Sequence, residues 1–221
     1  MEGSPKLRYA DLFKRHRHYN QLIQSTSHKY LHLFLALINP HETTLDIGSG
    51  YNSVIPRGYK KITIDLASEY KPDALGSAVA IPARSESISN ICCSWVLEHI
   101  EEPAIALEEF YRTLKPGGYL YLTANFVWHV HEAPRDFFRY TEHGLKHLLS
   151  NQGHWCIVLF EPTAGFWITM SQMFNYKVAK ILKGMHPLVT VPCQMLGIFL
   201  EKLDFDQSVA AGYCVIAQKP Y

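Results

Sequence analysis

The most constraining feature of this sequence is a regular alternation of short apolar or β-branched runs with helical stripes. The runs predict strands at 43–47, 61–66, 88–95, 119–124, 155–161 and 212–218. A helix is expected from Pro103 to Leu114, because proline suits the first turn and apolar residues then recur at helical spacing. Another is expected after Thr141, which can cap it, and should close near Gly153. This alternation predicts an α/β fold with a mainly parallel sheet covered by helices on both faces.

Two parts of the chain depart from this alternation. Residues 1–40 predict two helices, the second at about 28–38, which we expect to form an N-terminal helical cap. Residues 163–211 separate the last two strands and are helical in composition and unusually apolar. We expect an extra helical layer here, packed against the sheet; a substrate lid, a homodimer surface and a shallow membrane contact are the alternatives. The predicted core therefore comprises 41–162 and 212–221.

Charge and cysteine usage narrow the classes of partner. The 221 residues carry a formal net charge of +1, which gives no reason to expect a nucleic-acid partner. Five cysteines, without a CxxC pair, predict buried free thiols and a reducing, cytoplasmic environment. The first residues are polar and basic, so we expect no secretory signal, and no apolar run is long enough to predict a transmembrane segment.

A glycine-rich loop, DIGSG at 46–50, follows the first expected strand. In an open parallel sheet, ligands bind beyond the carboxyl ends of the strands, and glycines let the backbone approach them closely. The third glycine of a dinucleotide motif is replaced by Ser53. Pro56 and Gly58 leave little room for the helix whose N-terminus would bind a pyrophosphate. The loop therefore predicts a nucleotide-like ligand without phosphates.

Two carboxylates suggest which ligand this is. S-adenosylmethionine has no phosphate, and Asp46 beside the loop can receive its ammonium group directly or through water. Asp65, at the end of the next strand, can accept charge-assisted hydrogen bonds from both ribose hydroxyls. We therefore expect S-adenosylmethionine as the cofactor.

Four motifs, at 45–50, 62–66, 95–100 and 114–118, carry a family resemblance. Their order and spacing resemble the Rossmann-like (class I) S-adenosylmethionine-dependent methyltransferases, most closely the type 11 small-molecule group. The resemblance covers roughly residues 40–160 and the last strand. It implies a seven-stranded, mostly parallel sheet whose last strand is antiparallel, with the apolar helical segment inserted before that strand. It also implies that the cofactor is bound by Asp46, Gly48, Ser49, Gly50, Asp65, Leu66, Ser77, Ala78 and Ser94.

Two positions depart from the family pattern. Ser77 stands where these enzymes usually have an acid that meets the adenine amino group, and Asn90 replaces a common acid at the start of the third core strand. A neutral hydroxyl makes a hydrogen bond weaker by ~1 kcal/mol than a carboxylate does. The departures predict weaker cofactor binding rather than its loss.

Candidates for catalysis follow the fifth strand, in a segment that resembles one found in a subgroup associated with sugar or surface-polymer pathways. Methyl transfer is a direct displacement, so most of the work is alignment, but a hydroxyl or protonated amine acceptor also needs a base. His131 is our first choice as base, with anchoring of the loop as the alternative. Asp136 and Arg139 either pair with each other or position the substrate, and Tyr140 is a further candidate. His129 and His131 form an H-x-H pair, but without an evident third ligand we expect no metal ion.

The sequence therefore predicts a methyltransferase that acts on the oxygen or nitrogen of a small molecule, such as a sugar or natural product. One alternative is an RNA or protein methyltransferase, although the chain lacks a basic, aromatic-rich tract. The other is a catalytically inactive, cofactor-binding regulatory or scaffold protein with 163–211 as its partner surface. The departures at Ser77 and Asn90 leave that alternative open.

Overall fold

The computed structural model describes residues 21–182, 187–204, 206 and 208–221. They fall into two units: 28–162 with 212–221 in one, and 21–27 with the described part of 163–211 in the other. The first helix predicted in the N-terminal cap lies outside the described residues. The predicted division into cap, core and insertion stays a prediction, although residues 28–40 belong to the same unit as the core.

The larger unit is built on one seven-stranded sheet with the order β3-β2-β1-β4-β5-β7-β6. Its strands are β1 (Thr44–Ile47), β2 (Lys61–Asp65), β3 (Ala74–Leu75), β4 (Ile88–Ser94), β5 (Leu114–Asn125), β6 (Cys156–Pro162) and β7 (Gly212–Gln218). β1 to β5 pair in parallel, whereas β7 runs antiparallel to both β5 and β6. The predicted fold class is thus confirmed. The chain order reverses between β1 and β4, which is where open parallel sheets bind ligands.

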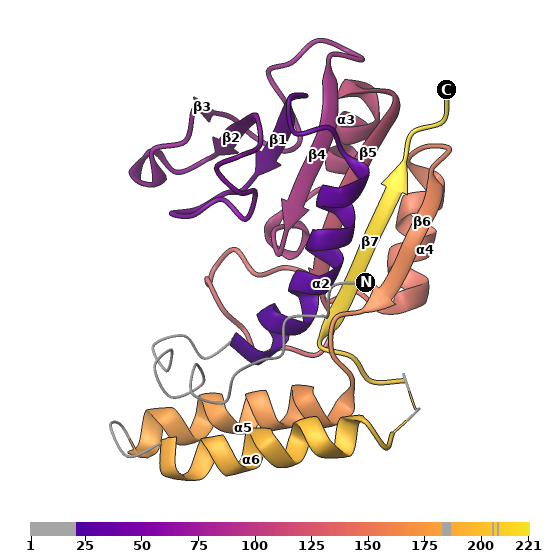
Figure 1. The fold of residues 1–221 in the computed structure, drawn as a ribbon. Coiled ribbons are helices and arrows are strands. Elements are labelled where there is room, and N and C mark those ends of the chain that lie inside the picture. The colour runs from indigo at the N-terminus through magenta and orange to yellow at the C-terminus, as the bar shows by residue number, and fades with distance from the viewer. Residues whose placement is uncertain (1–20, 183–186, 205, 207) are drawn as a thin grey trace. The chain divides into compact units, whose positions relative to one another are not determined.

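Helices lie on both faces of this sheet, with α2 on one side and α3 and α4 on the other (Figure 1). The helices are α2 (Gln21–Leu37), α3 (Pro103–Thr113), α4 (Glu142–Asn151), α5 (Phe166–Leu182) and α6 (Pro187–Glu201), with 3₁₀ turns η1 (Ser68–Tyr70) and η2 (Leu97–His99). α3 begins at the expected proline. The Thr141 hydroxyl accepts a hydrogen bond from Gly144 N at 3.0 Å, which confirms the predicted cap of α4. No helix occurs between residues 51 and 60, as the sequence predicted.

Three boundaries differ from the prediction. α2 begins earlier, at Gln21, and the two-residue strand β3 was not predicted. β5 begins at Leu114, although the following Pro-Gly-Gly was expected to be a helix stop outside the strand. The cause is pairing with the C-terminus, because Gly117 N donates to Lys219 O and Lys219 N donates to Gly118 O. A contact so distant in sequence is invisible to local patterns.

One part of the core of the larger unit lies where α2 packs on the sheet. Phe34 of α2 is fully buried, and its ring centroid lies 5.4 Å from that of Tyr121 of β5. Cys92 and Cys214 belong to the same buried cluster. All five cysteines are free thiols. Cys92, Cys93 and Cys214 are buried as expected, whereas Cys156 is exposed and Cys193 is half-buried.

The smaller unit is a hairpin of α5 and α6. A Cβ atom at Gly197 of α6 would lie 2.6 Å from the Ser171 hydroxyl of α5, so the helices approach closely because this position has no side chain. The carboxylate of Glu201 accepts hydrogen bonds from Gly165 N and Ile168 N and so caps the free amides at the start of α5. None of the described helices is both long and apolar enough to cross a membrane.

Phe34 offers a test of this packing. We expect Phe34→Ala to lower the free energy of unfolding by about 3–5 kcal/mol, because it leaves a cavity between α2 and β5. Leu33→Ala, on the neighbouring half-exposed residue, should change it by less than about 1 kcal/mol. Urea unfolding of both variants measures the difference, and equal losses would show that α2 is not held by this contact.

Candidate functional site

A cavity of about 830 Å³ lies at the carboxyl ends of β1, β2 and β4, at the point where the strand order reverses. The loops after these strands and part of the segment after β5 form its wall. The lining residues are Ile47, Gly48, Gly50, Tyr51, Ile64, Asp65, Leu66, Ala67, Tyr70, Gly76, Ser77, Ala78, Val79, Trp95, Val96, His99, Ile100, Glu101, Glu102, Glu132 and Arg135. The cavity is the place where the fold predicts a ligand.

The glycine-rich loop forms one wall, and its backbone requires glycine at Gly48. The φ of Gly48 is +65°, and a Cβ atom there would lie 2.5 Å from a methyl carbon of Val96. Trp95, just before Val96, itself has a φ of +58°. Non-glycine residues rarely adopt this conformation, and they do so most often at functional sites. The loop after β1 and the turn after β4 are therefore fitted closely to each other beside the cavity.

Asp65 joins the loops that follow β1 and β2. One of its carboxylate oxygens accepts from Gly50 N and the other from Ala67 N, both at 3.0 Å. Asp65 also lines the cavity. Since a carboxylate oxygen can accept more than one hydrogen bond, both oxygens retain capacity for the hydroxyls of a ligand.

The charge of the lining decides which ligands the cavity suits. The lining has four acidic residues, Asp65, Glu101, Glu102 and Glu132. Against these, it has one arginine, Arg135, and no lysine among the described residues. Such a wall repels a pyrophosphate and attracts a cation. The residues present therefore fit a phosphate-free ligand with positive charge, which S-adenosylmethionine is through its sulfonium and ammonium groups.

The structure places most of the predicted cofactor residues in the wall of the cavity. These are Gly48, Gly50, Asp65, Leu66, Ser77 and Ala78. It adds two aromatic side chains that the sequence prediction omitted. Tyr51 and Tyr70 pack edge to face, with ring centroids 4.6 Å apart, and both line the cavity. Tyr51 follows the glycine-rich loop directly, which was the available signal.

Three predicted cofactor residues lie outside the cavity wall. Side chains alternate along a strand, and Ile47 lines the cavity while the preceding residue, Asp46, is buried elsewhere. Burial raises the pKa of Asp46, and its Oδ2 atom has no hydrogen-bond partner among the described residues. The Ser94 hydroxyl lies 3.2 Å from the hydroxyl of Thr123. Ser49 is not part of the lining either.

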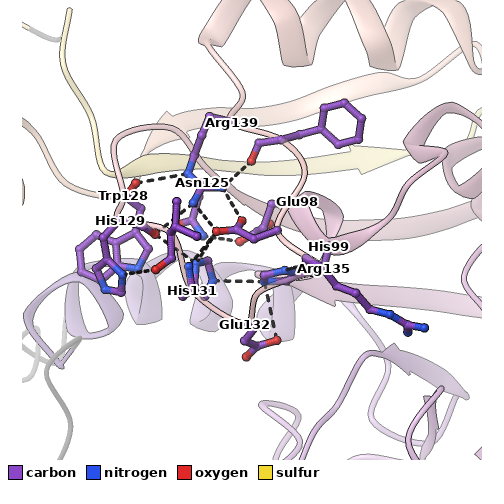
Figure 2. Close-up of polar contacts among 12 residues, drawn as sticks. Glu98, His99, Asn125, Trp128, His129, His131, Glu132, Arg135 and Arg139 are labelled. Atoms are coloured by element: carbon purple, nitrogen blue, oxygen red, sulfur yellow. Dashed lines mark hydrogen bonds and ion pairs between the residues drawn. The ribbon is translucent and has the colours of Figure 1, made fainter.

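The predicted catalytic segment packs against η2, and Figure 2 shows its residue His131 beside Glu98 and His99 of η2. Arg139 and Asp136 form a two-point ion pair with N–O distances of 2.6 and 2.7 Å. Arg139 also donates to the backbone oxygens of Trp128 and His129. The guanidinium holds the pKa of the buried Asp136 carboxyl well below its usual range. Of the two roles considered, the structure shows the mutual pair, and this pair fixes the shape of the loop.

His131 lies behind the cavity wall, whereas His99 forms part of it. Asp136 accepts from His131 N at 2.8 Å and lies 3.4 Å from His131 Nδ1. The Nε2 atom of His131 lies 3.1 Å from the Nε2 atom of His99 (Figure 2). Burial lowers the pKa of His131, so its neutral form is favoured. The structure thus connects His131 to the cavity through His99.

Glu98 of η2 is a fully buried carboxylate beside these histidines. Asn125 Nδ2 donates to Glu98 Oε1, while Oε2 has no hydrogen-bond partner among the described residues. Burial raises the pKa of Glu98 to about 7.

Backbone hydrogen bonds hold the catalytic segment on η2. Phe137 N and Phe138 N donate to the backbone oxygen of Glu98, and the Tyr140 hydroxyl donates to Leu97 O at 3.1 Å. Tyr140 is buried outside the cavity wall, and burial raises the pKa of its hydroxyl.

Sequence reasoning missed the residues that carry charge at this end of the cavity, namely Glu98, His99, Glu132 and Arg135. The motif at 95–100 was recognised, but it was read as a family marker and its acid and histidine were not weighed as functional groups. Glu132 and Arg135 lie in the catalytic segment between residues that were chosen.

The comparisons agree with this fold. Residues 45–122 match the family model described as a methyltransferase domain. No curated protein matches the chain in sequence.

Several solved structures share the fold at low sequence identity. An S-adenosylmethionine-dependent methyltransferase from Archaeoglobus fulgidus is 17% identical, with 96% of this chain and all of that chain covered and a TM-score of 0.58. A complex of the Haloferax volcanii Trm112 methyltransferase activator with a putative methyltransferase is 16% identical, with 99% of this chain and 100% of that chain covered and a TM-score of 0.59. Phosphoethanolamine N-methyltransferase 2 of Haemonchus contortus, in complex with S-adenosyl-L-methionine, is 13% identical, with 98% of this chain and 61% of that chain covered and a TM-score of 0.58.

The sheet order and the glycine-rich loop beside its reversal point are those of a Rossmann-like fold. The match over 45–122 shows a methyltransferase domain in this part of the chain, as its motifs predicted, and S-adenosylmethionine is the cofactor that the lining fits. The cofactor supplies an already activated methyl group.

Gly48 offers a test of the loop geometry. We expect Gly48→Ala to destabilise the protein by about 1–3 kcal/mol, because the new methyl group meets Val96 at a left-handed φ. Gly58→Ala is the matched control, since a Cβ atom there meets nothing within 4 Å. Urea unfolding measures both, and a Gly48→Ala variant as stable as Gly58→Ala would contradict the described packing.

Proposed function

We propose that the protein transfers the methyl group of S-adenosylmethionine to an oxygen or nitrogen atom of a small molecule bound in the same cavity. The observation that carries this proposal is the continuity of the cavity, which connects the glycine-rich loop and Asp65 with His99, Glu132 and Arg135. Its volume of about 830 Å³ is within the range of sites for small ligands.

Each residue proposed for the cofactor site takes its role from the part of the cofactor that it is expected to contact. Asp65 accepts the ribose hydroxyls, and the backbone of Gly48 and Gly50 lies beside the methionine part. Leu66, Ser77 and Ala78 surround the adenine. The acidic lining favours the sulfonium form, which is the reactive one, over the neutral product. Asp46, Ser49 and Ser94 act from behind this wall by holding the loop and strand ends in place.

The acceptor is proposed to bind at the opposite end, between the cofactor and η2. Here the histidine pair assists the loss of the acceptor proton, with His99 at the cavity and His131 behind it. Asp136 and Arg139 position His131, and Tyr140 positions η2 through Leu97. Arg135, which lines the cavity, offers a positive charge for an anionic group of the substrate.

A small-molecule acceptor is favoured over a macromolecule by the near-zero net charge and by the acidic wall, which would repel RNA. A homodimer through 163–211 remains our proposal for that segment, on the strength of its exposed apolar side chains, among them Phe174, Leu196 and Phe199. The free thiols support a cytoplasmic location.

Incubation of a cell extract with methyl-labelled cofactor tests the acceptor class. We expect protein-dependent label in the low-mass fraction. Label confined to RNA or protein would overturn the small-molecule proposal. If calorimetry detects no binding of S-adenosylmethionine even at millimolar concentration, the proposal that the protein is a methyltransferase is itself overturned.

Asp65→Ala should weaken binding of S-adenosylmethionine about tenfold or more, because two charge-assisted hydrogen bonds to the ribose are lost. Isothermal titration calorimetry measures the dissociation constant. Glu108→Gln, an equal change of charge on the exposed face of α3, is the control and should bind as the parent does. An unchanged constant for Asp65→Ala would refute the ribose assignment.

His131→Ala should lower kcat while leaving the affinity for S-adenosylmethionine nearly unchanged, because the ring lies outside the cofactor end of the cavity. His129→Ala, a histidine of the same loop, is the control. Turnover that survives in His131→Ala would show that the ring only anchors the loop.

A further inference from the structure

Three potential metal ligands converge beside the cavity. The ligand atoms of Glu98, His99 and His131 lie within 4.8 Å of one another (Figure 2). The sequence offered only the pair His129 and His131, whereas the fold brings the motif at 95–100 next to the second of these. Two imidazoles with one carboxylate form a ligand set used by zinc and by other divalent transition ions.

The hydrogen bonds of both rings leave their inward nitrogens without a proton. His99 Nδ1 faces the backbone oxygen of Arg135, which can only accept, so Nδ1 carries the ring proton. His131 Nδ1 faces the backbone oxygen of His129 and the ionised Asp136, with the same consequence. In the neutral rings, the two Nε2 lone pairs therefore face each other across 3.1 Å. This arrangement is repulsive unless a proton or a metal cation lies between them.

Glu98 supplies a second, independent sign of a cation site. Its side chain is fully buried, and Oε2 lacks a hydrogen-bond partner among the described residues. A buried polar atom without a partner costs free energy, and a buried negative charge costs considerably more. A cation bound next to the carboxylate removes both costs.

We propose that Glu98, His99 and His131 bind a divalent transition-metal ion, with zinc as the best match. The nitrogen ligands of a tetrahedral zinc ion are about 3.4 Å apart, close to the observed separation of the two Nε2 atoms. Glu132 Oε2 lies 3.9 Å from His99 Nε2 and is mostly exposed, so it can complete the site or yield its position to a ligand.

The groups behind the histidines match those that support metal sites. In such sites the second ring nitrogen donates to a carboxylate or a backbone oxygen, which fixes the orientation of the ring. His131 has Asp136 in this role and His99 has Arg135 O. Because Arg139 holds Asp136 in turn, the orientation of the His131 ring is fixed without the ion.

The open side of the proposed site is toward the cavity, since His99 and Glu132 both line it. An acceptor hydroxyl bound there would release its proton to solvent more readily. Its oxygen would then attack the methyl carbon, and the electron pair of the broken carbon–sulfur bond would stay on sulfur. His131 would thus act as a ligand rather than as the proton acceptor. This role rests on the proposed function, whereas metal binding itself does not.

The test is titration of the chelator-treated full-length protein with zinc, followed by X-ray absorption spectroscopy. We expect one zinc ion per chain, with nitrogen and oxygen ligands at about 2.0–2.1 Å and an imidazole signature. Sulfur ligands at about 2.3 Å would mean binding to a cysteine such as the exposed Cys156 and would overturn the proposal. Absence of binding would also overturn it and would indicate a proton shared by the two rings.

Single substitutions locate the site. His99→Ala and Glu98→Gln should each weaken zinc binding by about a hundredfold or more, because the first removes a direct ligand and the second replaces a carboxylate with a neutral amide. His129→Ala is the matched control and should bind zinc as the parent does. Since Glu98 is buried, circular dichroism must first show that Glu98→Gln is folded; His99→Ala alone decides the question if it is not. Unchanged binding in His99→Ala would refute the assignment.

Calorimetry with S-adenosylmethionine on the zinc-free protein separates this inference from the proposed function. Cofactor binding without zinc binding would refute the metal site and leave the methyltransferase proposal intact. Zinc binding without cofactor binding would support the metal site and refute the methyltransferase proposal.

Discussion

The carboxylate of Asp65 is the point on which the cofactor end of the structure depends. With one oxygen on Gly50 N and the other on Ala67 N, it holds the loops after β1 and β2 at a fixed separation. These amides face a cavity and would otherwise need water or a ligand as acceptor. A single side chain therefore both shapes the wall and keeps free acceptor capacity for a hydroxyl-bearing ligand.

The opposite end of the cavity depends on a different constraint, the docking of a loop on η2. Glu98 O accepts two backbone amides of that loop, and Arg139 closes the loop through Asp136. As a result, His131 meets His99 although the two are far apart in sequence. The polar groups gathered here are buried and incompletely paired, which is costly for stability and typical of a site that binds a charged group.

The sequence predicted the fold well because its signals are local. The alternation of strands and helices, the proline at the start of α3 and the cap at Thr141 each depend on neighbours within a few residues. The start of β5 was wrong for the opposite reason, since Gly117 and Gly118 pair with Lys219 at the other end of the chain. The glycine-rich loop could be predicted because its residues, from Asp46 to Gly50, are consecutive in sequence.

By itself, the sequence determined the α/β class, the position of the glycine-rich loop and the choice of a phosphate-free methyl donor. These follow from residue types at short spacing, which the backbone converts directly into local geometry. Only the tertiary structure decided which acids and histidines share a space. In the structure, Asp46 does not line the cavity, and His99 lines it where His131 was expected. Glu98 lies beside both histidine rings. The physical reason is that side-chain direction and burial depend on packing between segments that are remote in sequence.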